Sequence, residues 1–219
     1  MLKKLFKYIG IFILSYLCFS ILLTLAYIII NPPVTILMMQ KPSKVERQWV
    51  DIEDISPNII QAVVAAEDDQ FLVHNGFDFK QIKLAIEDSQ KKGKPTRGAS
   101  TISQQTAKNV FLWNGRSYLR KGLEVYYTFL IETFWSKERI MEVYLNVIEY
   151  GDGIYGIEAA SQHYFNRSAK KLTKRQSALI TAALPSPLKR NPAHPTKYLN
   201  RRANKIMRLM NNIGPVKFE

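Results

Sequence analysis

Residues 120–134 read Arg-Lys-Gly-Leu-Glu-Val-Tyr-Tyr-Thr-Phe-Leu-Ile-Glu-Thr-Phe, and the spacing of their apolar side chains decides the fold class. Large apolar residues stand at positions 123, 127, 130, 131 and 134. This is the i, i+4, i+7, i+8, i+11 pattern of one helix face. The pattern continues to Tyr150 after a break near Ser136. We therefore predict a mostly α domain organised around this segment.

Glu124 lies at the edge of this apolar stripe. With Leu123 at zero and about 100° per residue, the stripe covers about −20° to 80° and Glu124 falls near 100°. An edge position suits a carboxylate that lines a cleft. A solvent-facing ion pair with Lys121 fits the spacing equally well, so both interpretations stay open.

Helical patterns flank this segment on both sides. Ser56 and Pro57 are typical of a helix start, and Ile60, Val63 and Val64 follow at helical spacing. Further helices are expected after Phe77 and over 100–110, 136–145, 157–164, 173–184 and 198–211. Residues 90–99 form a basic, glycine- and proline-containing loop pattern. No convincing alternating strand pattern and no internal repeat is present.

The N-terminus carries a membrane-spanning pattern. Residues 8–30 contain no charged side chain, and this run is long enough to cross a hydrocarbon core. A cleaved signal peptide is the alternative, but its apolar region is usually shorter. Lys3, Lys4 and Lys7 place the tail, 1–7, in the cytoplasm. We expect a single-pass protein of the bacterial cell membrane, which is the inner membrane in a Gram-negative cell. A connector at 31–55 and a domain at 56–219 then lie on the extracytoplasmic side.

The charge balance points to an anionic partner. The chain has a formal net charge of +13, and without the three N-terminal lysines the rest keeps +10. Acidic lipid headgroups, a diphosphate or nucleic acid would match this charge. The extracytoplasmic placement argues against nucleic acid. Cys18 is the single cysteine, so neither a disulfide framework nor a cysteine metal site is possible within one chain.

Glu67 is an anomaly in its own helix. It stands seven residues after Ile60 and so continues an apolar stripe. Burial raises the pKa of a carboxyl group and makes it a better proton acceptor at neutral pH. A buried ion pair with a nearby cation is the simpler alternative. His74 stands nearby among Asp68, Asp69 and Asp78, but the spacing matches no common zinc signature, so we predict no metal centre there.

A second polar stretch lies between the two glutamates. It reads Gly98-Ala-Ser-Thr-Ile-Ser-Gln-Gln-Thr-Ala-Lys108, and its hydroxyl and amide groups offer donors for sugar or phosphate oxygens at a helix start. Lys108, Arg116, Arg120 and Lys121 add cations within the next dozen positions. Taken alone, these cations fit a solvated helix face better than a binding site.

Together these residues resemble glycosyltransferase family 51, the glycosyltransferase domain of class A penicillin-binding proteins and their monofunctional relatives. Five blocks match in order. They are Glu67-Asp-x-x-Phe71-x-x-His74-x-Gly76-x-Asp78; Gly98-x-Ser100-Thr101-Ile102-x-Gln104-Gln105; Arg120-Lys121-x-x-Glu124 with Glu142-x-Tyr144-Leu145-Asn146; Gly151-x-Gly153-x-x-Gly156 with Tyr164-Phe165; and Ala182-Ala-Leu-Pro185-x-Pro187 with Asn191-Pro192. The chain ends soon after the fifth block, so we expect the monofunctional form.

The resemblance implies a lysozyme-like, mostly α fold and an inverting transfer that polymerises lipid II into β-1,4-linked glycan strands, with release of undecaprenyl diphosphate. It implies that Glu67 is the general base and that Glu124 assists around the diphosphate. It also implies that Lys108 and Arg116 hold the diphosphate, with Arg120 as a further cation. Ser100, Thr101, Gln104 and Gln105 are implied to line the cleft. The family uses Mg²⁺ or Mn²⁺. The implied partners are lipid II, the growing strand, membrane lipid, and other cell-wall synthesis or division proteins.

Two other functions remain as alternatives. A lysozyme-like, peptidoglycan-cleaving enzyme would also use a glutamate with a raised pKa. Cleaving a neutral glycosidic bond needs no diphosphate-binding cations, which disfavours it. A non-catalytic membrane-tethered scaffold would use the basic surface and would not depend on Glu67.

Overall fold

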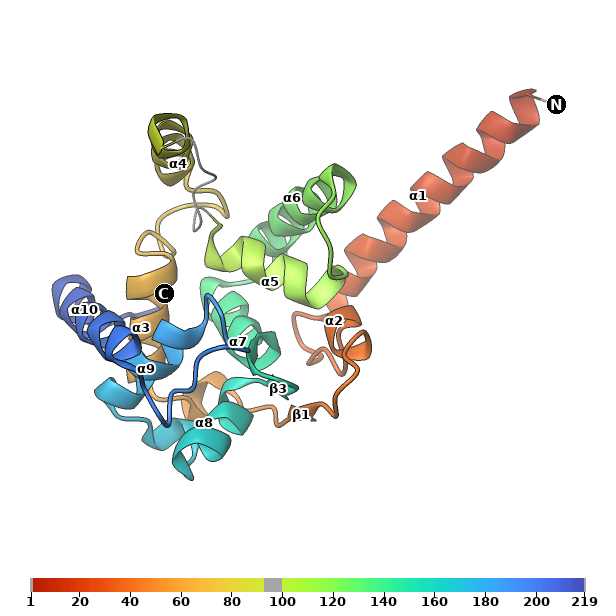
Figure 1. Cartoon of the computed structure of the whole chain (residues 1–219). Coiled ribbons are helices and arrows are strands. Elements are labelled where there is room, and N and C mark those ends of the chain that lie inside the picture. Colours follow the sequence, from red (N-terminus) through yellow and green to blue (C-terminus); the bar gives the residue numbers. More distant parts are fainter. Residues whose placement is uncertain (1, 93–99, 219) are drawn as a thin grey trace.

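The computed structural model describes residues 2–92 and 100–218. In this part of the chain the protein is mostly helical, with one small sheet (Figure 1). The helices are α1 Leu2–Ala26, α2 Ile36–Met39, α3 Pro57–Glu67, α4 Phe79–Lys92, α5 Ile102–Phe111, α6 Tyr118–Phe134, α7 Lys137–Val147, α8 Ile157–Phe165, α9 Lys174–Ala183 and α10 Lys197–Ile213. Short 3-10 turns occupy Ile52–Asp54 and Ala169–Lys171. The mostly α prediction is confirmed, and most of the expected basic loop at 90–99 lies outside the described residues.

Helix α1 is long and apolar enough to cross a membrane by length and composition. It projects from the remainder of the chain, and most of its side chains are exposed (Figure 1). It begins before the predicted span of 8–30 and ends at Ala26, with turns continuing to Ile29. Its buried residues are Ser20 and Thr24, which face α6 and the residue that follows it.

The main core surrounds α7. Ile140, Met141, Tyr144 and Leu145 of this helix are fully buried, and α5 packs against both α6 and α7. Burial of these large side chains supplies most of the hydrophobic stabilisation. Because α5 is held between two helices, its polar residues have fixed positions relative to the other core elements.

A second core joins α3, α9 and α10. Its centre consists of alanines, with Ala62 on α3, Ala178 and Ala182 on α9 and Ala203 on α10 all completely buried. Small side chains let helix backbones approach closely. This second core places α10 beside α3, which ends at Glu67.

A three-stranded sheet corrects the prediction that no strand is present. Its strands are β1 Glu46–Arg47, β2 Glu149–Gly151 and β3 Ile154–Tyr155, in the order β1-β3-β2. Strand β1 runs parallel to β3, with Glu46 opposite Ile154, and β2 runs antiparallel to β3. Strands of two or three residues are too short to carry a recognisable alternation.

Candidate functional site

A cleft of about 950 Å³ opens between the end of α3, α5, α7, the sheet and the N-terminal half of α10. Its lining includes Lys41, Glu67, Gln105, Lys108, Tyr144, Glu149, Arg190, Tyr198 and Arg202. These residues come from seven separate elements or connections. The cleft is therefore a product of the tertiary fold and not of one continuous segment.

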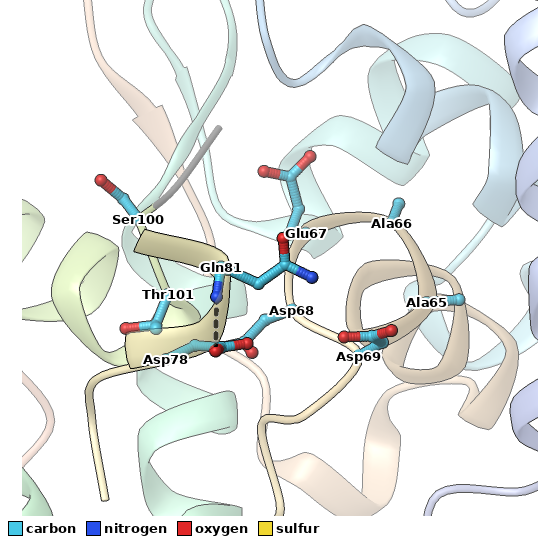
Figure 2. Close-up of a pocket in the computed structure, with 9 residues that line it drawn as sticks. All are labelled: Ala65, Ala66, Glu67, Asp68, Asp69, Asp78, Gln81, Ser100 and Thr101. Atoms are coloured by element: carbon cyan, nitrogen blue, oxygen red, sulfur yellow. Dashed lines mark hydrogen bonds between the residues drawn. The ribbon is translucent and has the colours of Figure 1, made fainter. Parts of the chain in front are cut away.

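Glu67 is the last residue of α3 and lines this cleft. It also borders a smaller pocket of about 210 Å³ that contains Asp68, Asp69, Asp78, Gln81, Ser100 and Thr101. Figure 2 shows the Glu67 carboxylate pointing away from the carboxylates of Asp68, Asp69 and Asp78. Glu67 thus stands between the two hollows, with its carboxylate separated from the acidic group below it.

A chain of hydrogen bonds holds the Glu67 carboxylate. The Gln105 amide Nε2 donates to Glu67 Oε2 at 3.3 Å, and the buried Tyr144 hydroxyl donates to Gln105 Oε1 at 3.4 Å. Burial raises the pKa of Glu67; the Gln105 hydrogen bond and the Arg202 charge lower it, and Asp68 raises it. The net shift is upward, which moves the carboxylate toward the behaviour of a general base at neutral pH.

Asp68 connects the end of α3 to the start of α5. Its carboxylate is buried and accepts hydrogen bonds from the Ile102 backbone N–H at 2.9 Å and from His74 Nε2 at 2.9 Å. The Gly76 backbone N–H donates to His74 Nδ1 at 3.0 Å. Nε2 is thus paired with Asp68, and Nδ1 accepts from Gly76. His74 therefore holds the turn after α3 and is not free to bind a metal through either nitrogen.

Gly76 is required by this turn. It has a φ of +84°, and a Cβ there would lie 2.8 Å from Thr128 Cγ2 and 2.9 Å from Glu132 Cγ. Its carbonyl oxygen accepts a hydrogen bond of 2.7 Å from the Thr101 hydroxyl. The turn therefore packs tightly against α6 and also fixes the start of α5.

The four residues expected to line the cleft divide into different roles. Thr101 caps α5 and forms a reciprocal capping box with Gln104, whose amide oxygen accepts from the Thr101 backbone N–H at 3.0 Å. Thr101 and the exposed Ser100 border the smaller pocket, and Gln105 lines the large cleft. Gln104 is buried and borders neither, because its side chain is used in the cap.

Lys108 follows Gln105 by three residues and therefore projects from the same side of α5 into the cleft. Burial lowers its pKa, the Glu124 carboxylate raises it, and the Arg120 and Lys121 cations lower it. The net effect is a lowered pKa. Lys108 thus lines the cleft and lies within electrostatic reach of Glu124.

Glu124 is buried on α6 and is 4% exposed. Its two oxygens contact Arg120 Nη1 at 2.9 Å and Lys121 Nζ at 2.5 Å. Of the two interpretations of Glu124, the ion pair agrees better with the structure. The pair differs from the prediction because the glutamate is buried and does not face solvent. Glu124 is not among the residues that line either pocket. Both glutamates nevertheless lie next to α5. Glu67 accepts a hydrogen bond from Gln105, and Glu124 interacts electrostatically with Lys108.

Arg116 and Arg120 are placed differently from Lys108. Arg116 is exposed in the connection between α5 and α6 and borders neither pocket. Arg120 is mostly buried, with its Nε donating to the Gly115 carbonyl at 2.8 Å and its Nη1 paired with Glu124. Of the three predicted cations, Lys108 alone lines the cleft.

Sequence reasoning missed two cations on the opposite wall. Arg202 of α10 lines the cleft, and its Nε is buried without a hydrogen-bond partner within the described residues. Arg190 donates to the Ala182 carbonyl at 3.1 Å and lies over the Tyr198 ring. Arg202 stands three residues after the buried Leu199. Its position beside the apolar stripe of α10 was the one sequence feature that could have indicated a side chain facing the protein.

Comparison with known proteins bears directly on this arrangement. A family model described as Transglycosylase matches residues 35–211. The chain is 48% identical to a biosynthetic peptidoglycan transglycosylase of Bacteroides thetaiotaomicron, over 96% of this chain and 88% of that protein. Identity is 55% to the protein of the same name from Caulobacter vibrioides, over 82% of this chain and 80% of that protein. A third relative of this name, from Haemophilus influenzae, is 51% identical over 78% of this chain and 70% of its own length.

The chain belongs to the transglycosylase family. The matched residues contain the whole cleft, including Glu67, Lys108 and Arg202, and leave out α1. The resemblance predicted from five sequence blocks is thereby confirmed at the level of the family. In this transglycosylase, two of the blocks have a visible structural purpose, since they build the turn after α3 and the cap of α5.

The transglycosylase does not present a preformed divalent metal centre in its described residues. No group of three or more histidine, cysteine, aspartate or glutamate side chains is arranged to hold a metal there. The Glu124 oxygens are paired with cations, and Asp68 accepts from His74 and Ile102. Mg²⁺ and Mn²⁺ prefer several oxygen ligands, and the Glu124 and Asp68 carboxylates are already bound by protein groups.

Proposed function

We propose that this transglycosylase is a peptidoglycan glycosyltransferase that polymerises lipid II into β-1,4-linked glycan strands and releases undecaprenyl diphosphate. One observation carries the proposal. A partly buried glutamate with a raised pKa lines a cleft that also contains Lys108, Arg190 and Arg202. A base and a set of cations in one cleft match a hydroxyl nucleophile and a diphosphate leaving group.

Glu67 is the proton acceptor in this mechanism. Its carboxylate removes the proton from the 4-hydroxyl of the acceptor N-acetylglucosamine, and that oxygen attacks C1 of the donor N-acetylmuramic acid. The bond between C1 and the phosphate oxygen breaks on the opposite face, so the configuration at C1 inverts. The proton remains on Glu67 until it is lost to solvent.

The cations of the cleft stabilise the leaving group. Negative charge develops on the diphosphate as its bond to C1 breaks, and positioned cations lower the energy of that state. Lys108 is the best-placed group, because it lines the cleft one helical turn from Gln105. Glu124 acts from behind: its pairs with Arg120 and Lys121 keep two further cations near Lys108.

A lysozyme-like cleavage activity fits this cleft less well. Hydrolysis of a glycosidic bond needs a general acid with a raised pKa, which Glu67 would satisfy. It does not need several cations in the same cleft, and two of them, Lys108 and Arg202, have their charge partly desolvated. Desolvating cations costs free energy, which is offset when a bound anion takes the place of water.

The decisive test is polymerisation of purified lipid II by the full-length chain, compared with Glu67→Gln. We expect Glu67→Gln to lose at least about 100-fold in rate, the usual contribution of a general base. The fold should persist, with stability at neutral pH unchanged or raised by about 1 kcal/mol because a desolvated charge is removed. Glu138→Gln is the matched control, since Glu138 is exposed and borders neither pocket.

Product analysis separates the alternatives. Long glycan from lipid II supports the proposal, whereas turnover only of preformed strands would support cleavage. A Glu67→Gln chain that polymerises at more than about a tenth of the wild-type rate would reject Glu67 as the base.

A further inference from the structure

The excess of positive over negative charge in this chain is confined to its C-terminal part. Residues 159–218 contain 13 lysines and arginines and not one aspartate or glutamate. The remaining residues carry 18 basic and 18 acidic side chains. The formal net charge of +13 therefore belongs entirely to residues 159–218, which include α9 and α10.

Helix α10 displays part of this charge as a continuous exposed stripe. Lys197, Arg201, Lys205 and Arg208 follow one another at intervals of four, four and three residues, and all four are exposed. The opposite face buries Leu199, Ala203, Ile206 and Met210. A 17-residue helix is about 25 Å long, so the stripe, named here the α10 stripe, extends along much of one edge of the domain.

The α10 stripe is not neutralised by carboxylates. Within residues 2–92 and 100–218, Lys170 is the one cation of 159–218 that forms an ion pair, with the exposed Asp54 at 2.7 Å. The neighbouring cations of α9 contact side-chain amides instead. Arg175 Nη2 donates to Asn200 at 2.7 Å, and Lys174 donates to Asn211. These contacts leave the positive charge on the surface.

The stripe adjoins the cleft. Tyr198 and Arg202 lie on the same helix and line the cleft, and Arg190 lies over the Tyr198 ring. Arg201 and Lys205 stand one and three residues from Arg202. The row of basic side chains is therefore continuous from the rim of the cleft to the outer face of α10. Figure 1 shows α10 on the opposite side of the domain from α1, which separates the stripe from the candidate membrane span.

We propose that the α10 stripe binds the peptide carboxylates of the glycan strand as the strand extends beyond the cleft. This rests on the proposed function, because lipid II supplies each disaccharide with a pentapeptide. A peptide joined to the sugar through its N-terminus ends in a free carboxylate, so the product is a polymer with regularly repeated negative charge. Four exposed cations beside the cleft are complementary to such a polymer.

The expected affinity of the α10 stripe for the peptides is low enough for the strand to move. Single exposed ion pairs are weak and exchange readily with water, and several of them on one polymer bind together through their high effective concentration. The strand can therefore advance by one disaccharide after each transfer without first breaking a tight contact. Anionic lipid headgroups share the charge but not the position, because the stripe lies away from α1.

The test measures binding independently of polymerisation. The full-length chain in detergent is titrated into fluorescent soluble glycan strands that carry intact peptides, and into the same strands after enzymatic removal of the peptides. The test variant is Arg201→Gln/Lys205→Gln/Arg208→Gln. The control variant, Lys44→Gln/Lys80→Gln/Lys83→Gln, removes three exposed cations elsewhere and has the same net charge.

We expect the test variant to bind peptide-bearing strands about tenfold more weakly than wild type, the sum of three exposed ion pairs. The control should stay within about twofold, and peptide-free strands should bind all three proteins equally weakly. If the triple variant fails to fold by circular dichroism, Arg201→Gln/Arg208→Gln should weaken binding about fivefold, outside the range of the control.

Equal binding of peptide-bearing strands by wild type and test variant would overturn the proposal. So would a test variant that keeps strand binding but loses binding to phosphatidylglycerol vesicles, which would assign the stripe to lipid. Failure of the proposed function is distinguishable: wild type would then not polymerise lipid II, whatever the strand-binding result.

Discussion

The pKa of Glu67 is set by opposing effects. Burial raises its pKa, while the Gln105 amide and the Arg202 guanidinium lower it. A general base works only in its deprotonated form, so activity should fall as the pH decreases toward the raised pKa of Glu67. The Arg202 charge limits the rise in the pKa of Glu67, which gives Arg202 an electrostatic role beyond any contact with substrate.

Replacement of Arg202 should therefore change the pH profile and not only the rate. In Arg202→Gln the pKa of Glu67 rises further, and the acidic limb of kcat/KM for lipid II moves to higher pH. Arg202→Lys keeps the charge and should keep the limb close to the wild-type position. The check is kcat/KM measured across pH for all three proteins. A uniform loss at every pH would show that Arg202 acts on substrate binding alone.

Helix α5 is the element that joins the parts of the site. Its N-terminus is fixed by Asp68 and by the Thr101–Gln104 capping box, and its middle carries Gln105 and Lys108. The hydroxyl group of Thr101 and the amide group of Gln104 were predicted to bind substrate, but both form hydrogen bonds within this cap. The same local features thus position the helix, while the residues one turn further on face the cleft.

The junction between α1 and the domain is held by α6 and α7. The Ser20 and Tyr126 hydroxyls are 2.7 Å apart, and the Trp135 indole N–H donates to the Thr24 carbonyl at 2.8 Å. Beyond the end of α1, the Arg139 guanidinium of α7 donates to the Tyr27 and Ile30 carbonyls at 3.0 and 3.1 Å. The free carbonyl groups after a helix need such partners. Helix α1 is therefore fixed to the domain by these contacts.

Arg139→Gln should release this junction. We expect a loss of about 2–4 kcal/mol in the free energy of unfolding, because several charge-assisted hydrogen bonds disappear together. Arg139→Lys should recover only part of the loss, since one ammonium group cannot replace a planar guanidinium. Thermal unfolding in detergent gives the comparison. Arg208→Gln, an exposed position, should change stability by less than about 0.5 kcal/mol.

Over the whole chain, charge and apolar surface are placed at different ends. The apolar α1 projects from one side of the domain, and the basic α10 lies on the other (Figure 1). The cleft lies between them, bounded by α5 and α10. We propose that a lipid-bound donor reaches the cleft from the membrane, while the product leaves along the basic side. The extracytoplasmic placement of the domain is a prediction from Lys3, Lys4 and Lys7 before the apolar run.

The sidedness can be measured because Cys18 is the one cysteine of the sequence. In a Cys18→Ser background, Asn212→Cys should react with a membrane-impermeant maleimide in intact spheroplasts. Lys4→Cys should react only after the membrane is permeabilised, as the positive-inside rule requires. The reverse labelling pattern would contradict the extracytoplasmic placement of the domain.

The sequence by itself determined the fold class, the approximate positions of helices α3 to α10, the N-terminal apolar helix and the family. The helical stripe of 120–134, the cap at Ser56 and the five ordered blocks are local patterns, and local spacing is visible without coordinates. Glu67 was also found in this way, because a carboxylate in an apolar stripe is an anomaly of spacing.

Only the tertiary structure decided which polar residues face the cleft. Gln104 and Gln105 are neighbours, yet one closes a helix cap and the other donates to Glu67 from 38 positions away in the sequence. Arg202 reaches the cleft only because a layer of alanines brings α10 against α3. Such contacts depend on how helix faces pack across long sequence separations, and the period of a single helix does not contain that information.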